Sequence, residues 1–516
     1  MKAPLFNWLD HRAAGVLLHP TALPGDYGIG TLNDHCLEFI DFLADAGFKY
    51  WQICPLGPTG FGDSPYQSFS SYAGNPYLIS LRSLNAKDLL EDSILDELDE
   101  LPDSFVDFGA LYNAKWPVLD AVYERFVKSG QEIRPYGSFS KFKKDNESWL
   151  EAYAYYQALK GHFEGAPWYQ WPSGLLSFAK ARKSKLRKTL AREIDAQMFF
   201  QYLFFGQWNE VRAHAERRGI QIIGDLPIFV ALDSADVWQN QQYFQFDLKK
   251  AQPTAVAGSP PDYFSEDGQL WGNPLYDWDA LKKDGYSWWI DRLEAATNLC
   301  DVVRIDHFRG FDAYWKIPFG AKTARKGEWT DGPGIEFFDV VKAELPHCRL
   351  IAEDLGDLTD RVRELRRDSG LPGMAILQFA FGGDSDNFYL PHNAQSNCVL
   401  YPGTHDNDTS LGWYRSIDSQ TQDHVRRYLD VNGENIGWDL IRASYKSVAK
   451  LAVVPLQDLM NLGSEARFNT PGQATGNWQW RYSPKQLREL YGGTTEYLKS
   501  LSELCYRDGR PAVNTI

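Results

Sequence analysis

CDVVRIDH at residues 300–307 is the first of three short apolar runs that end in an acid; the others are RLIAED at 349–354 and VLYPGTHDND at 399–408. The acids are Asp306, Glu353 and Asp406, which stand 47 and then 53 positions apart. A strand, a loop, a helix and a return loop use about that length of chain. The spacing therefore predicts parallel strands that bring three carboxylates to one rim of a sheet. An α/β barrel carries its chemistry at that rim.

Eight strand-like runs are spread along the chain, at residues 15–18, 50–54, 220–226, 301–305, 350–352, 375–379, 398–401 and 451–455. Helical patterns lie between them, at residues 34–46, 195–218, 337–345, 358–368 and 423–429. This alternation is typical of an α/β fold and predicts a (β/α)8 TIM barrel. We expect one catalytic domain over residues 1–516.

Two gaps between these strands are too long for a simple crossover helix. After the second strand, residues 84–200 show several helical patterns, which predict an inserted helical subdomain. After the third strand, residues 230–280 are rich in Trp, Tyr, Gly and Pro. We expect that segment to be a long ordered loop with a functional role, because long loops in compact domains are usually functional.

Composition and net charge limit the kinds of molecule that the protein is expected to bind. The 516 residues carry a net charge of −15, and no extended basic face favours binding to nucleic acid. Aromatic residues are abundant, with 18 Trp, 27 Tyr and 30 Phe. They are compatible with ordinary core packing, and also with a carbohydrate site, where sugar rings stack on aromatic faces.

The expected location is the cytoplasm. The six cysteines are scattered without a CxxC spacing, which fits a reducing compartment. The first eight residues lack the basic and apolar pattern of a signal peptide. No apolar run approaches the ~20 residues that a membrane helix needs, so no membrane association is expected.

Each rim acid has a chemical and a structural interpretation. Asp306 shares a strand face with Arg304, whose charge would keep it ionised as a nucleophile; the alternative is a structural ion pair. Glu353 leaves an apolar strand, so burial would raise its pKa toward that of a general acid; the alternative is a helix cap. Asp406 lies beside His405, and the alternatives there are an Asx turn or a metal loop.

Other kinds of site have weaker support. The glycine order in residues 25–30 does not fit a dinucleotide fingerprint, and the chain has no GKS or GKT box. No group of His and Cys has zinc spacing, and no GxSxG elbow occurs. We therefore expect neither a metal nor an organic cofactor, and the three acids remain the strongest chemical set.

Eight short motifs together resemble a known family. They are GVLLHPT at 15–21, DSPYQ at 63–67, GNPY at 74–77, GDLPI at 224–228, QLWGNP at 269–274, RIDHFRG at 304–310, EDLG at 353–356 and THDND at 404–408. In this order they resemble the amylomaltases, the 4-α-glucanotransferases of glycoside hydrolase family 77. The resemblance extends from about residue 14 to about residue 482. Because few residues precede Gly15, the chain resembles the short, barrel-only form of the family.

The resemblance implies a role for each matching residue. Asp306 matches the nucleophile, Glu353 the general acid/base, and Asp406 the third acid, which binds sugar hydroxyls and stabilises the transition state. The implied substrate-binding residues are Tyr66, Asp225, Arg304 and His405 around the same sugar, Asp262, Tyr263, Phe264, Gln269 and Trp271 on a covering loop, and Asn469 on the acceptor side.

The implied reaction transfers segments of α-1,4-glucan to another glucan or to glucose with retention of configuration. The expected substrates are maltooligosaccharides, amylose and glucans derived from starch or glycogen, and the expected state is a monomer or a homodimer. Retention requires the carboxyl groups of Asp306 and Glu353 to be ~5–5.5 Å apart. Two alternatives stay open: an α-glucan hydrolase or debranching-type transferase on the same barrel, and a non-catalytic glucan-binding protein.

Overall fold

Eight parallel strands form the centre of the molecule in a computed structural model that describes residues 4–25, 27–261, 266–356 and 358–511. The strands are β1 (His11–Leu17), β2 (Tyr50–Gln52), β3 (Gln221–Pro227), β8 (Val302–Asp306), β11 (Leu350–Ala352), β12 (Gly373–Ile376), β13 (Cys398–Tyr401) and β14 (Leu451–Pro455). Each of the eight predicted strands overlaps one of them.

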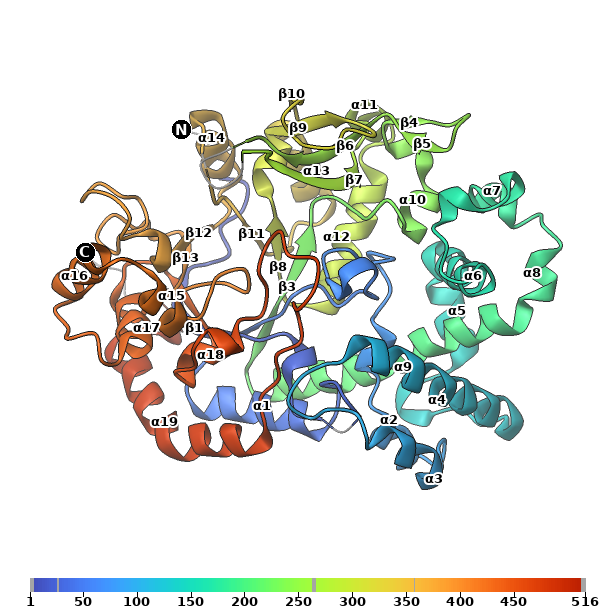
Figure 1. The fold of residues 1–516 in the computed structure, drawn as a ribbon, viewed down its shortest axis with the longest axis horizontal. Helices are drawn as coiled ribbons and strands as arrows, with labels where there is room; N and C mark the ends of the chain where they lie inside the picture. Colours follow the sequence, from blue (N-terminus) through green and yellow to red (C-terminus); the bar gives the residue numbers. More distant parts are fainter. Residues whose placement is uncertain (1–3, 26, 262–265, 357, 512–516) are drawn as a thin grey trace.

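The strand order is that of a barrel. Neighbouring strands pair in the order β11-β8-β3-β2-β1-β14-β13-β12. The ends of this series approach each other, since the Ala352 N–H of β11 donates to the Pro372 carbonyl, immediately before β12. Figure 1 shows the strands at the centre with helices around them. The predicted (β/α)8 barrel is thereby confirmed. A short strand, β15 (Asp508–Pro511), adds antiparallel to β1.

Alternation along the strands separates the barrel interior from its outer wall. In β8, Val302 belongs to a buried cluster shared with inward residues of the other strands, whereas Val303 and Ile305 belong to the large outer cluster. Because successive side chains of a strand point to opposite faces, Arg304 and Asp306 share the interior face with Val302. Strands buried on both faces require the near-continuous apolar runs seen in the sequence.

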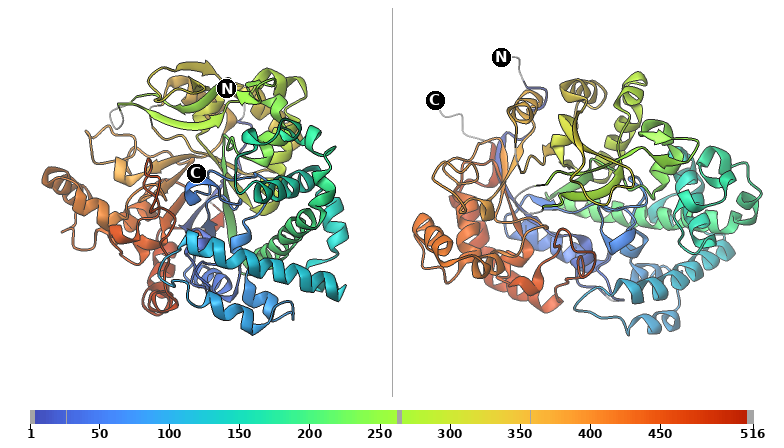
Figure 2. Two further views of the ribbon diagram at one scale, coloured as in Figure 1. Left: turned by 45° about the vertical axis from the view of Figure 1, so that its right-hand side comes forward. Right: turned by 45° about the horizontal axis from the view of Figure 1, so that its top comes forward.

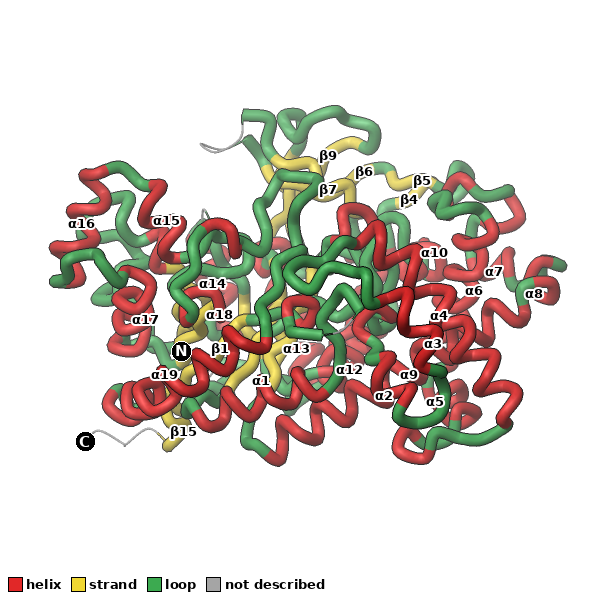
Figure 3. Tube along the Cα trace, turned by 60° about the horizontal axis from the view of Figure 1, so that its bottom comes forward, coloured by secondary structure: helices red, strands yellow, loops and turns green. Residues whose placement is uncertain are grey.

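Helices cover the outside of the barrel. Long helices that pack around it are α1 (Asp34–Asp45), α12 (Ser287–Leu299), α13 (Gly334–Glu344), α14 (Asp360–Ser369), α17 (Ile436–Lys446) and α19 (Pro484–Leu504). Figure 3 shows the strands within this surround of helices, with many loops on one side. Helix α1 begins at the Asn33 cap, whose side chain accepts from the His35 N–H.

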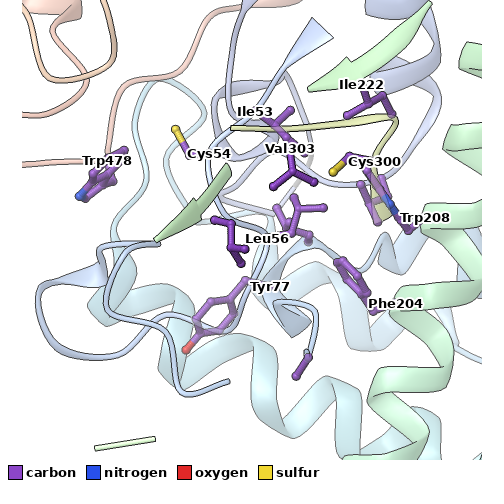
Figure 4. Packing of buried hydrophobic residues seen from close by; sticks show 14 of the residues in the cluster. Ile53, Cys54, Leu56, Tyr77, Phe204, Trp208, Ile222, Cys300, Val303 and Trp478 are labelled. Carbon is purple, nitrogen blue, oxygen red and sulfur yellow. The ribbon is translucent and has the colours of Figure 1, made fainter. Parts of the chain in front are cut away.

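Residues 81–217 between β2 and β3 are mostly helical and lie to one side of the barrel (Figures 1 and 2). The main helices are α4 (Phe108–Ser129), α6 (Glu147–His162) and α9 (Ala191–Arg217), with shorter helices α2 (Leu81–Asn85), α3 (Asp92–Leu95), α5 (Phe139–Asp145), α7 (Phe178–Ala181) and α8 (Leu186–Thr189). Helix α9 joins the segment to the barrel wall. Figure 4 shows Phe204 and Trp208 of α9 in the buried cluster with Ile53, Ile222 and Val303.

A four-stranded antiparallel sheet lies beside the barrel, at the top of Figure 1. Its order is β10-β9-β6-β7, with β6 (Ala255–Ser259), β7 (Gln269–Pro274), β9 (Ala313–Pro318) and β10 (Glu328–Asp331). The sheet thus joins residues from the segment after β3 with residues from the segment after β8. The prediction for residues 230–280 was a long ordered loop, without these strands. The same segment also contains α10 (Ala235–Gln239), the short pair β4 (Phe246–Asp247) and β5 (Gln252–Pro253), and α11 (Trp278–Lys283).

The connections that follow the last three strands of the barrel differ from one another. Within the described residues, only a 3-10 turn at Leu377–Phe379 and irregular chain connect β12 to β13. The predicted strand at 375–379 therefore ends at Ile376. After β13, α15 (Ser410–Ser416) and α16 (Ser419–Leu429) precede α17, and α18 (Leu456–Leu459) follows β14 directly.

Candidate active site

The carboxyl ends of β3 and β8 bring two acids onto one arginine. Nη1 of Arg304 donates to Oδ1 and Oδ2 of Asp225 at 2.8 and 2.7 Å, and to Oδ1 of Asp306 at 3.0 Å. The Asp225 side chain is 1% exposed and that of Arg304 is 4% exposed, but that of Asp306 is 30% exposed. The buried arginine therefore binds one fully enclosed carboxylate and one that still reaches solvent, where a substrate can approach.

The electrostatics of this trio follow from burial. Burial raises the pKa of Asp225, and the Arg304 charge opposes that effect. For Arg304, burial lowers the pKa, but Asp225 and Asp306 outweigh it and hold the pKa well above the ordinary value. Arg304 consequently stays charged, and its guanidinium contacts both carboxyl groups.

Glu353 lies one residue beyond the end of β11, and its carboxylate is held by backbone groups. Oε2 accepts from the His307 N–H at 2.7 Å, and Oε1 accepts from the Leu355 N–H at 3.0 Å. Burial, together with the negative charge of Asp306, raises the pKa of Glu353 to about 7 despite these bonds and Arg304. A carboxyl group with that pKa can both give and take a proton near neutral pH.

Asp406 has its own set of partners on the loop after β13. Oδ1 accepts a 2.6 Å hydrogen bond from Nδ2 of Asn469, and Oδ2 lies 3.4 Å from Nε2 of His405. Burial acts to raise the pKa of Asp406, but His405 and Asn469 outweigh it, so the pKa lies well below its usual range. Asp406 is therefore an anion across the neutral range, with about half of its side chain exposed.

Tyr66 connects the two halves of the site. Its hydroxyl donates to Oδ2 of Asp225 at 2.8 Å, and its ring stacks on that of His405 at 5.2 Å between centroids. Burial, followed by the charge of Asp225, raises the pKa of Tyr66 well above the ordinary value, so the hydroxyl keeps its proton. Tyr66 thus lies between the Asp225–Arg304–Asp306 trio and the His405–Asp406 pair.

The structure places Trp271 of β7 beside this site as well. Its ring meets that of His307 edge to face at 4.8 Å, and its Nε1 donates to Oε1 of Gln269 at 3.0 Å. Strand alternation puts Gln269 and Trp271 on the same face of the small sheet. Asp262, Tyr263 and Phe264 lie outside the described residues.

Two neighbours of the acids were not among the residues singled out from the sequence. His307 has the left-handed conformation, with φ of 52°, and this turn directs its N–H at Glu353. Its position directly after Asp306 was a usable signal. Trp478 packs on both Tyr66 and His405, at 5.9 and 5.8 Å. No local pattern distinguishes it among 18 tryptophans.

A family model described as 4-alpha-glucanotransferase, glycoside hydrolase family 77, matches residues 18–487. The chain belongs to this family. The resemblance noted in the sequence is thereby confirmed, as is the predicted class of enzyme, a 4-alpha-glucanotransferase of the amylomaltase type.

Relatives in this family match almost the whole chain. The 4-alpha-glucanotransferase of Thermus thermophilus is 48% identical over 503 residues, which are 95% of this chain and 99% of the relative. A chloroplastic/amyloplastic 4-alpha-glucanotransferase of Arabidopsis thaliana is 43% identical over 92% of this chain and 82% of its own length. The solved amylomaltase of Streptococcus agalactiae in complex with acarbose is 37% identical, with a TM-score of 0.91 over 97% of this chain and 100% of that chain.

Among the described residues, no group of three or more His, Cys, Asp and Glu side chains could hold a metal ion. Over the same residues, the helices are all too short or too polar to cross a membrane.

Proposed function

We propose that Asp306, Glu353 and Asp406 carry out transfer of α-1,4-glucan segments by a retaining double displacement. One observation carries the assignment: three carboxyl groups at neighbouring strand ends have three different environments. Asp306 is partly exposed beside Arg304, Glu353 has a pKa of about 7, and Asp406 has a depressed pKa. Carboxylates whose environments separate their pKa values are suited to separate tasks.

In the first step, a carboxylate oxygen of Asp306 attacks the anomeric carbon of the donor glucan. Glu353 gives its proton to the glycosidic oxygen as that bond breaks, so the leaving chain departs with a free 4-hydroxyl. Asp306 becomes a glycosyl ester. Asp406, held by His405 and Asn469, accepts hydrogen bonds from hydroxyls of the reacting sugar.

In the second step, a second glucan or a glucose enters in place of the leaving chain. Its 4-hydroxyl attacks the same carbon, its proton goes to Glu353, and the bond to Asp306 breaks. Two inversions give net retention. The proposal requires the Asp306 and Glu353 carboxyl groups to lie ~5–5.5 Å apart, since a gap of ~9 Å would favour an inverting hydrolase.

Transfer needs protection of the ester from water. We assign that task to the segment at residues 230–280, because Trp271 packs on His307, the residue next to Asp306. Exclusion of water leaves a sugar hydroxyl as the better acceptor. Tyr66, Asp225, Arg304, His405 and Gln269 complete the proposed sugar contacts, with Asn469 on the acceptor side. The acarbose bound by the Streptococcus agalactiae relative supports an α-glucan as ligand.

Incubation with maltotriose tests the proposal. Transfer produces glucose together with a ladder of longer maltodextrins, while the number of reducing ends stays constant. A rise in reducing ends in step with maltotriose consumption would instead show an α-glucan hydrolase. No consumption at all would show a glucan-binding protein without catalysis.

A further inference from the structure

A small cavity adjoins the Asp406 loop within the barrel. Its walls come from the ends of β1, β2 and β14, from Thr404 and His405, and from Phe468. It has about 20 Å³ of room for water. One buried water molecule needs roughly 10–15 Å³ and two to four polar partners. The cavity is therefore of a size for a single water molecule.

Two histidines that line this cavity each have a buried ring nitrogen without a hydrogen-bond partner among the described residues. These nitrogens are Nδ1 of His19 and Nδ1 of His405, and the two residues are 5% and 7% exposed. Buried polar atoms in folded proteins nearly always have a partner, which is the protein itself or an ordered water molecule. An ordered water molecule in the cavity would supply a partner to each of them.

The two rings are complementary in hydrogen-bonding character. Burial, with the nearby charge of His405, lowers the pKa of His19 to about 3, so this ring is neutral. The Cys54 backbone acts on this pKa as a hydrogen-bond acceptor does, opposing the effect of burial. A neutral imidazole that donates from one nitrogen accepts at the other.

His405 has the opposite character. Burial lowers its pKa, but the charge of Asp406 and the hydrogen bond to it outweigh burial, and the pKa is raised above its ordinary value. A protonated ring that donates from Nε2 to Asp406 donates from Nδ1 as well. The titratable and charged groups that face His405 are Asp406, Asp225, Arg304, Tyr66 and His19.

We propose that one water molecule bridges Nδ1 of His405 to Nδ1 of His19, and that His19 is a positioning residue for the third acid. The water accepts from Nδ1–H of His405 and donates to Nδ1 of His19. Thr404 and Gln457 line the same cavity and offer further oxygen atoms. The bridge fixes the orientation of the His405 ring, and with it the contact of Nε2 with Asp406 at 3.4 Å.

The importance for catalysis rests on the function proposed above for Asp406. His405 also stacks on Tyr66, which donates to Asp225. A His405 ring held at both nitrogens therefore keeps Asp406 and the Tyr66–Asp225 pair in fixed positions relative to each other. Without the acceptor at His19, the bridging water loses a partner and is no longer held. The protonated form of His405 then loses its own partner, and its pKa falls.

The test uses the full chain labelled with 15N at histidine only, with NMR titration of the ten imidazoles. In the unmodified protein, we expect His405 to carry protons on both nitrogens at pH 6, with an Nδ1 proton that is protected from exchange. His19→Leu removes the acceptor and lowers the His405 pKa by roughly one pH unit, the equivalent of one lost hydrogen bond. His19→Asn keeps an acceptor and restores most of the pKa.

Activity follows the same order if the proposal holds. The kcat/KM for maltotriose at pH 7 falls severalfold in His19→Leu, with about tenfold as the upper limit for a pKa change of one unit, and falls less in His19→Asn. Phe468→Leu is the matched control, since it alters the packing of the same cavity and leaves both nitrogens in place. It lowers thermal stability while the His405 titration stays unchanged.

An unprotonated Nδ1 on His405 at pH 6 in the unmodified protein would overturn the bridge, and this measurement needs no variant. The same holds for an unchanged His405 titration in His19→Leu. Failure of the proposed function has a different signature: Asp406→Asn would then keep full activity, while the His19 and His405 signals of the unmodified protein are as expected for the bridge.

Discussion

The side chain of Glu353 accepts a 2.7 Å hydrogen bond from the backbone N–H of His307. This bond joins Glu353, the residue after β11, to His307, the residue after β8. It also limits how far the carboxyl group can move from Asp306. The two acids of the proposed mechanism are thus coupled through one backbone turn, and the charge of Asp306 helps to raise the pKa of Glu353 to about 7.

The pH dependence of the first chemical step follows from this pKa. Glu353 must be protonated to assist the leaving group, so kcat/KM for maltotriose falls above pH 7, by about tenfold per pH unit. In Glu353→Gln, maltotriose turnover is lost. With α-glucosyl fluoride, the same variant should largely keep the first step, formation of the glycosyl ester, because the fluoride leaving group needs no proton. A pH profile that stays flat from pH 6 to 9 would contradict the role of Glu353.

The nucleophile can be tested apart from folding. Asp306→Ala is expected to lower maltotriose turnover by at least about 10⁴-fold, because no covalent ester can form. Addition of azide to this variant with α-glucosyl fluoride should give β-glucosyl azide, since the small anion fills the space of the lost carboxylate. Circular dichroism checks that the barrel is intact. Substantial turnover of maltotriose by the folded variant would remove Asp306 as the nucleophile.

The barrel and the position of the three acids could be predicted from the sequence for a physical reason. Strands buried on both faces need continuous apolar runs, and an acid directly after such a run, as at Asp306 and Glu353, must lie at a strand end. The small sheet could not be found in this way. Its strands β6 and β9 are 54 residues apart at their nearest ends, and their pairing is decided by tertiary contacts.

Loop residues in the site are the other part that local patterns miss. Tyr66 and Asn469 lie on irregular chain, and only the family resemblance connected them with the acids. His19 appears in the sequence as one residue of the GVLLHPT motif, and its unpartnered nitrogen becomes visible only when the cavity is formed. Irregular backbone has no periodicity from which the direction of a side chain can be read.

Asn469 is expected to determine the pH below which kcat/KM falls. The folded pKa of Asp406 is depressed, so its anion persists until the pH falls through that low value. Asn469→Ala removes the 2.6 Å hydrogen bond and raises this pKa toward the ordinary value near 4. The loss of kcat/KM at acidic pH should then begin at higher pH than in the unmodified protein. An acid limb that does not move would assign Asn469 to substrate contact alone.

Arg304 is expected to be essential for the stability of the folded protein as well as for the proposed glucan transfer. Arg304→Met leaves the Asp225 carboxylate buried without a cation, with the Tyr66 hydroxyl still donating to it, which should lower the free energy of unfolding by about 3–5 kcal/mol. The second change Asp225→Asn removes the unpaired charge, so the double variant should recover a large part of that loss. Urea denaturation measures each step.

The matched control for Arg304 is Arg363→Met, which removes an exposed partner of Asp360. Exposed ion pairs contribute little, so the control should cost less than about 1 kcal/mol. If Arg304→Met were as mild as the control, the Asp225 carboxylate would have to find another partner or become neutral in the folded protein. The pH dependence of unfolding for the single variant separates those two cases.

The helical insertion is expected to act on the sugar site through one ion pair. Nζ of Lys160, on α6, lies 2.5 Å from Oδ2 of Asp233, and Oδ1 of Asp233 accepts from the Tyr156 hydroxyl at 2.6 Å. The same ammonium group lies 4.9 Å from the ring centre of Phe69, three residues beyond Tyr66. The Phe69 carbonyl accepts from the N–H of Ala235, which lies two residues after Asp233.

Lys160→Met should therefore loosen the loop that carries Tyr66 without touching a reacting atom. We expect a loss of about 3 kcal/mol in the free energy of unfolding and a KM for maltotriose raised about tenfold, with kcat changed less. Lys141→Met removes an exposed partner of Asp145 on α5 and should leave both quantities nearly unchanged. A stability loss in Lys160→Met with an unaltered KM would show that the pair holds the insertion in place but does not position Tyr66.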